Sequence, residues 1–254
     1  MDRLTSDPAE DSFPAWTPDS RRIIFSSRRA GARNVYWREA DATGEDQRLT
    51  SAARPQFSSS VTPDGSHLLV QELFPTTGWD IARVPLAALA TGEKADTAAA
   101  RSERQSEPLI QGRSTEWDAY VSPNGRYVAY VSDETGTFEV YVRPYPRVDD
   151  GRWTVSAGGR YPVWARNGRE LFYLDNESGL TSVAVDTEGS TFSAGEPVKL
   201  RDTAYWGQGA FDVSPDGQRF LFIKEGAPAA ASTPLSFVVV LNWFEELKAR
   251  VAAK

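Results

Sequence analysis

The sequence has no cysteine and a single histidine, His67, among its 254 residues. Without cysteine the chain can form neither a disulfide nor a thiolate nucleophile, and a zinc site with sulfur ligands is excluded. A Ser-His-Asp triad would have to use His67, but no Gly-x-Ser-x-Gly elbow accompanies it. We therefore predict no catalytic residue, no metal and no cofactor, and we expect His67 to be a surface residue of a strand.

Basic charge and long apolar runs are also scarce. Lysine and arginine number 28 against 35 aspartates and glutamates, so the net charge is -7. Nucleic-acid binding depends on basic residues that meet phosphates, so we expect no nucleic-acid partner. No stretch reaches the roughly 18 apolar residues of a membrane helix, and the polar residues 1–10 lack the apolar region of a signal peptide. We expect a soluble monomer without membrane insertion, either cytoplasmic or an extracytoplasmic domain of a longer bacterial protein.

An internal repeat organises the chain. Each copy places tryptophan or valine before a turn in which proline, then aspartate or asparagine, then glycine follow, and a β-rich run comes next. Proline presets φ for the first central turn position, and glycine takes the left-handed position after a type I turn. Ser20 replaces the glycine in one copy and Arg166 replaces the proline in another. The predicted hairpin turns lie at 16–20, 61–65, 121–125, 164–168 and 213–217.

Two further β-rich segments follow most of these hairpins, which makes four strands per repeat. Repeats of about 40 to 50 residues with four strands are typical of β-propeller blades. We therefore predict an all-β fold, a five-bladed β-propeller of four-stranded antiparallel blades in a single domain. A segment rich in alanine, threonine, glutamate and arginine, 86–105, is expected to be an insertion with a short helix at 86–90. The predicted blades are 7–50, 51–111, 112–157, 158–201 and 202–242, the last with 2–6 added.

The fifth blade lacks an outer strand, because its third strand runs into a predicted C-terminal helix at 243–252 with Asn242 as its cap. The N-terminus carries the missing type of segment, since Arg3-Leu4-Thr5-Ser6 repeats the sequence of the first blade's outer strand at 48–51. We expect this N-terminal strand to close the last blade and so remove an open sheet edge. The alternative is that the chain is part of a six- to eight-bladed propeller.

The Pro-Asp-Gly turn, the Arg-Leu-Thr segment and the tryptophan or valine before the turn resemble the TolB-like propeller repeat, also called the WD-like Pro-Asp repeat. The resemblance covers residues 3–241. The ending at 238–247 looks like the C-terminus of bacterial proteins in which such a propeller follows a serine/threonine kinase domain, although no kinase motif is present here. Similar propellers also precede the hydrolase domain of prolyl-oligopeptidase-like peptidases. The resemblance implies a kinase-associated or peptidase-associated module.

In a propeller the loops that lead into the innermost strands surround one mouth of a central channel. Their polar and aromatic residues suggest a binding site for a protein, a peptide or a small ligand. We predict a non-enzymatic sensing or scaffold module. The alternatives are a glycosidase- or lyase-type enzyme, which needs two close acids among Glu10, Asp11, Glu116, Asp118 and Asp212, and a purely structural accessory domain. The predicted site residues are Glu10, Asp11, Arg54, Gln56, Glu116, Trp117, Asp118, Arg160, Tyr161, Tyr205, Trp206 and Gln208.

Overall fold

The computed structural model describes residues 4–86, 105–202, 211–223 and 237–240. In these residues the regular structure consists of twenty strands and one short 3-10 segment, Val148–Asp150. The predicted all-β class is therefore confirmed. Most of the predicted insertion and its helix, and the whole predicted C-terminal helix at 243–252, lie outside the described residues.

The strands form five antiparallel sheets in the described part of the chain, and each sheet uses strands that follow one another in sequence. The first contains β1 (Asp11–Trp16), β2 (Arg22–Ser27), β3 (Asn34–Glu39) and β4 (Gln47–Arg48). The second contains β5 (Gln56–Val61), β6 (His67–Phe74), β7 (Gly78–Pro85) and β8 (Glu107–Ile110). The third contains β9 (Glu116–Val121), β10 (Tyr127–Ser132), β11 (Glu139–Pro144) and β12 (Trp153–Thr154).

The last two sheets depart from this pattern. In the fourth, β13 (Arg160–Trp164), β14 (Glu170–Leu174) and β15 (Gly179–Asp186) are joined by two short strands, β16 (Ser193–Ala194) and β17 (Val198–Asp202). Both short strands pair with β15. The fifth contains β18 (Phe211–Val213), β19 (Phe220–Ile223) and β20 (Phe237–Val240).

All five predicted turns join the first and second strands of their sheets. In the second sheet the amide of Gly65 donates to the carbonyl of Thr62 at 2.8 Å, and Gly65 has a φ of 71°. The carboxylate of Asp64 accepts the amide of Ser66 at 3.0 Å and the hydroxyl of Thr62 at 2.6 Å. Ser20 reaches the same left-handed conformation, with a φ of 58°, without being glycine. The acidic residues of the turns therefore hold the hairpins together.

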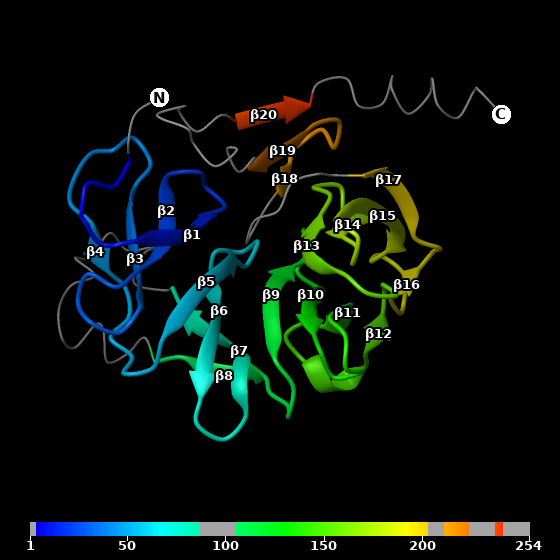
Figure 1. Ribbon diagram of the computed structural model, residues 1–254, viewed down its shortest axis with the longest axis horizontal. Helices are drawn as coiled ribbons and strands as arrows, with labels where there is room; N and C mark the ends of the chain where they lie inside the picture. The colour runs from blue at the N-terminus through cyan, green and yellow to red at the C-terminus, as the bar shows by residue number, and fades with distance from the viewer. Residues whose placement is uncertain (1–3, 87–104, 203–210, 224–236, 241–254) are drawn as a thin grey trace, which may run out of the picture.

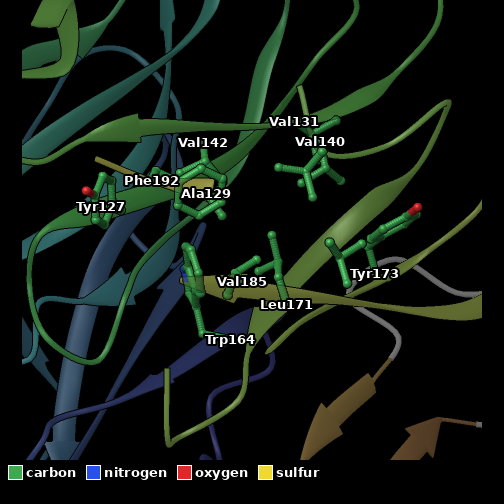
Figure 2. Close-up of a cluster of buried hydrophobic side chains, with 12 residues drawn as sticks. Tyr127, Ala129, Val131, Val140, Val142, Trp164, Leu171, Tyr173, Val185 and Phe192 are labelled. Carbon is green, nitrogen blue, oxygen red and sulfur yellow. The ribbon is translucent and has the colours of Figure 1, made fainter. Parts of the chain in front are cut away.

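The sheets are arranged around a common centre (Figure 1), and the innermost strands β1, β5, β9, β13 and β18 each pack against the next in chain order. The hydrophobic core lies between neighbouring sheets. Figure 2 shows one such cluster, in which Val131 and Val140 of the third sheet face Leu171 and Val185 of the fourth. Each side chain buried in this way contributes about 1.5–3 kcal/mol. This face-to-face packing of radial sheets is that of a propeller.

The predicted closing strand is not formed by the described residues. Arg3 lies outside them, and the segment from Leu4 to Ser6 has no strand pairing. The carbonyl of Leu4 instead accepts a hydrogen bond from the buried guanidinium of Arg38 in β3, and the hydroxyl of Thr5 bonds to Asp11. These contacts hold the N-terminal segment on the first sheet, so the fifth sheet has three strands in the part that the structure describes.

The two repeat tryptophans also differ. Trp164 is buried, and its indole donates to the carbonyl of Tyr120 in the preceding inner strand at 2.8 Å. Trp16 holds the equivalent position in β1 but is 56% exposed. The same repeat position is therefore a contact between sheets at Trp164 and an exposed position at Trp16.

Candidate binding site at the N-terminal ends of the inner strands

The N-terminal ends of the inner strands share an irregular backbone. The pairing of β1, β5, β9 and β13 with the next strand shifts register near this end. Phe13, Asp118 and Tyr161 occupy the same position in three of these strands and have φ values of 55°, 51° and 58°. For a residue other than glycine, such a conformation costs about 1–3 kcal/mol of strain energy. Bulges of this kind redirect side chains, and they set the geometry of the predicted site.

Two of the predicted acids are held by arginines of the first sheet. Oδ2 of Asp11 lies 2.9 Å from Nη2 of Arg29, which also binds Asp46. Burial opposes the ionisation of Asp11, but hydrogen bonds from Ser27, Arg29 and Thr5 outweigh it and lower the pKa of that carboxyl. Asp11 is thus an internal partner within the first sheet. The second acid, Glu10, pairs with an arginine in a unit considered further below.

Arg54 and Gln56 both bind one buried carboxylate. Glu72 of β6 is fully buried, and its two oxygens accept Nε of Arg54 at 2.6 Å and Nε2 of Gln56 at 2.8 Å. The guanidinium of Arg54 also lies 4.7 Å from the centroid of Phe74. Because a buried carboxylate needs such partners, both predicted residues have a structural role in the second sheet. Glu72 itself was not predicted.

Glu116 is buried against a second carboxyl group, that of Asp80. Asp80 of β7 is fully buried and Glu116 of β9 is 4% exposed, and a hydrogen bond joins the two carboxyl groups. Burial, this hydrogen bond and the negative charge of Asp80 together raise the pKa of Glu116 to about 8. Glu116 therefore keeps its proton at neutral pH and donates it to Asp80, which links the second sheet to the third.

Sequence reasoning missed Asp80, although the repeat contained a signal for it. Asp80 holds the same repeat position as Asn34 in β3. The amide of Asn34 donates to the carbonyl of Ala52 at 3.1 Å, after the outer strand of its own sheet. In the same way Asp80 accepts the backbone amide of Gly112 at 3.3 Å, beyond β8. A polar residue at this position ties the loop after the outer strand to the third strand.

A group of ionisable side chains lies farther along the inner strands. Asp118 is buried, and its Oδ1 accepts Nε2 of Gln71 at 3.2 Å. Burial raises the pKa of Asp118 to about 6, although the hydrogen bond from Gln71 and the charge of Arg160 act in the opposite direction. Burial, Asp118 and Asp212 also raise the pKa of Tyr120. Asp118 and Asp212, from different sheets, thus both act on one tyrosine.

An aromatic pair and an arginine meet where the third and fourth sheets adjoin. The rings of Trp117 and Phe138 are stacked with centroids 5.8 Å apart, and the guanidinium of Arg160 lies 4.1 Å from the centroid of Phe138. Gly159 brings the chain close enough for this contact, since its amide donates to the carbonyl of Phe138 at 2.8 Å. Any Cβ on Gly159 would lie 2.5 Å from the ring of Tyr173. We call Trp117, Asp118, Phe138 and Arg160 the aromatic–arginine cluster.

The remaining predicted residues are less informative. Tyr161 is half-buried and packs on the core between the fourth and fifth sheets. His67 begins β6 and is half-buried, with its Nδ1 2.8 Å from the hydroxyl of Ser66. Among the described residues no three His, Cys, Asp or Glu side chains lie together as metal ligands. Tyr205, Trp206 and Gln208 lie outside the described residues.

Comparison with known proteins identifies the fold. No family model matches the sequence, and no curated protein sequence is similar to it. The structure is similar to TolB from Acinetobacter baumannii, with a TM-score of 0.63 and 17% identity over 88% of this chain and 51% of that one. It is also similar to a putative TolB from Agrobacterium tumefaciens, with a TM-score of 0.63 and 15% identity over 93% of this chain and 78% of that one. The fold is a TolB-like β-propeller.

This TolB-like propeller spans about half the length of the Acinetobacter protein. The fold is shared with enzymes, because a gluconolactonase from Xanthomonas campestris matches with a TM-score of 0.60 and 14% identity over 87% of this chain and 72% of that one. A fold alone does not determine function, so the side chains must decide between a binding module and an enzyme. In the described residues of the propeller, no helix is long and apolar enough to cross a membrane.

Proposed function

We propose that this propeller is a non-enzymatic module that binds a peptide or a small ligand at the N-terminal ends of its inner strands. The aromatic–arginine cluster carries the proposal. Arg160 is exposed and rests on Phe138, while Trp117 and Phe138 offer half-buried apolar surface next to it. Aromatic anchors with a few polar groups beside them are typical of peptide and ligand sites.

The contrast with the other predicted residues supports this choice. Asp11, Arg54, Gln56 and Glu116 each have an internal partner that accounts for their presence. Among the described residues no carboxylate lies within ion-pair distance of Arg160. An arginine whose side-chain donors are not used by the described residues can offer them to a ligand. The cluster is therefore a better candidate than the rest of the predicted set.

A carboxylate enzyme of glycosidase or lyase type is the second candidate, because Asp118 and Asp212 both act on Tyr120. Glu116 is a poor choice for the acid in such a reaction, since the carboxyl group it contacts, that of Asp80, is fully buried. An enzyme of this kind would use Asp118, whose pKa is raised to about 6. If the chain is such an enzyme, it turns over a lactone or uronate substrate and the substitution Asp118→Asn abolishes that turnover. The binding proposal expects no turnover by the wild-type chain or by the Asp118→Asn variant.

A selection from a phage-displayed library of random peptides tests the proposed function. The intact chain serves as target, and the selected peptides are then measured against Trp117→Ala, Arg160→Gln and the control Arg147→Gln. The side chain of Arg147 is 83% exposed and forms an ion pair with Asp150 within its own loop, so its loss removes the same charge away from the cluster. We expect peptides that lose at least tenfold in affinity with both cluster variants and keep it with the control. Failure to select peptides, or binding that ignores the cluster, would refute the proposal and favour a purely structural domain.

A further inference from the structure

A second arginine in the chain shows how a guanidinium on an aromatic pair is neutralised at this end of the propeller. Arg33, just before β3, lies 4.9 Å from the centroid of Phe57 in β5, and Phe57 packs against Trp79 at 5.2 Å. Nη2 of Arg33 lies 2.9 Å from Oε2 of Glu10, and its Nη1 donates to the hydroxyl of Ser12 at 2.6 Å. The unit consists of an aromatic pair, an arginine and a carboxylate.

The aromatic–arginine cluster combines the same kinds of side chain, except that no carboxylate of the described residues pairs with the arginine and the arginine lies on the other ring of the pair. Trp117 and Phe138 hold the repeat positions of Phe57 and Trp79, and Arg160 lies on Phe138. Arg160 comes from the sheet that follows its aromatic pair, whereas the arginine of the first unit comes from the sheet before. Arg160 is exposed, and no carboxylate of the described residues lies within ion-pair distance of it. In the part of the chain that the structure describes, the place that Glu10 takes in the first unit has no counterpart here.

We propose that Arg160 binds a carboxylate group of the ligand. That carboxylate pairs with Arg160 as the carboxylate of Glu10 pairs with Arg33. This inference rests on the proposed binding function. A guanidinium offers a planar fork of N–H donors that a carboxylate accepts in pairs. The guanidinium of Arg160 lies 4.1 Å from the centroid of Phe138, and its exposed side chain can present N–H donors to a ligand. The apolar part of the ligand then packs on Trp117.

The surroundings favour a carboxylate over a group of higher charge. Asp118 is buried in the neighbouring inner strand, close enough for Arg160 to lower its pKa. A phosphate would bring up to two negative charges beside Asp118, and each adds repulsion that grows as the dielectric falls. A carboxylate brings a single negative charge. It can come from a peptide, through its C-terminus or an acidic side chain, or from a small organic acid.

Nuclear magnetic resonance of the Arg160 Nε–Hε group tests the inference directly, because this signal reports on the guanidinium itself. Four probes are titrated into the intact chain. N-acetylphenylalanine carries a peptide-like terminal carboxylate, and N-acetylphenylalaninamide is its neutral match. Benzoate represents a small aromatic acid, and inorganic phosphate represents the competing anion. We expect saturable shifts with N-acetylphenylalanine and at least tenfold weaker binding of the amide. Binding of benzoate as well would identify small acids as sufficient, and its failure to bind would point to a peptide.

Variants separate the carboxylate inference from the proposed function. Arg160→Gln and Arg160→Lys should both weaken N-acetylphenylalanine at least tenfold, as followed by the backbone amide signals, since lysine keeps the charge but lacks the fork. Arg147→Gln should bind normally. Equal binding of the amide, equal binding of phosphate, or full binding by Arg160→Gln would overturn the inference. If selected peptides depend on Trp117 yet show no preference for acidic groups, the carboxylate inference fails while the binding function stands. If no peptide is selected and no probe binds, both fail.

Discussion

Replacing Glu116 by glutamine should make the propeller more stable at alkaline pH. In the folded chain the pKa of Glu116 is raised from 4.5 to about 8 by burial and by its hydrogen bond to Asp80. The folded state therefore binds this proton more tightly than the unfolded state. The stabilisation that protonated Glu116 gives the folded state is fully present below about pH 4.5. It is lost as the pH rises through the folded pKa of about 8.

The size of the effect follows from the shift. At 1.36 kcal/mol per pKa unit, moving the pKa of Glu116 from 4.5 to about 8 corresponds to about 5 kcal/mol as an upper bound. Relaxation of the buried pair and entry of water reduce this cost, so we expect a loss of about 2–4 kcal/mol between pH 5 and pH 9. Glutamine has nearly the shape of the protonated acid and can donate to Asp80 at every pH, so the variant avoids this loss.

Urea unfolding followed by tryptophan fluorescence, at pH values from 5 to 9, measures the difference. The free energy of unfolding of the wild type should fall over this range by more than that of Glu116→Gln. Glu45→Gln is the matched control, because Glu45 is exposed, and its pH profile should follow the wild type. Parallel profiles for the wild type and Glu116→Gln would refute the idea that this buried pair shares a proton.

Three further predictions concern the turns, the contact between sheets and the site. Ser20→Gly should raise the free energy of unfolding by about 0.5–1 kcal/mol, because Ser20 has a φ of 58° that glycine adopts without strain. Gly65→Ala should lower it by about 1 kcal/mol, because Gly65 has a φ of 71°. A loss of stability for Ser20→Gly or a gain for Gly65→Ala in urea unfolding would contradict the turn geometry. Trp164→Phe should cost at least about 1 kcal/mol through loss of the indole hydrogen bond to Tyr120, and an unchanged urea midpoint would exclude that bond. Calorimetric titration with N-acetylphenylalanine should show affinity falling as pH rises through about 6, the pKa of Asp118, because the ionised carboxyl repels the probe and competes for the guanidinium. Asp118→Asn should remove this pH dependence; a profile that it leaves intact would assign the effect to another group.

Much of the fold could be predicted because the repeat encodes local structure. The turn residues act within four or five positions of the chain, and the alternation of apolar residues around them defines strands. The described residues of the N-terminal segment depart from this local logic. Leu4 to Ser6 resemble an outer strand in sequence, but the buried Arg38 and Asp11 bond to this segment instead. Competition between two possible partners for one segment cannot be weighed from sequence similarity alone.

The site shows the same division. The described members of the predicted set lie at or just before the N-terminal ends of the inner strands, because their positions follow from strand order. The repeat could not tell which of them are occupied by internal partners. Gln56 serves Glu72, and Glu116 meets Asp80, through contacts between strands whose register is set only by the folded sheets.

By itself the sequence determined the five hairpin turns, the all-β class and the absence of thiol chemistry, because each depends on residue type and short spacing. Only the tertiary structure decided which charges are balanced. Arg33 and Arg160 both lie on aromatic rings, yet one faces Glu10 and the other no carboxylate of the described chain. The physical reason is that charge pairing depends on distances of a few ångströms between side chains of different sheets. Those distances exist only once the sheets have packed.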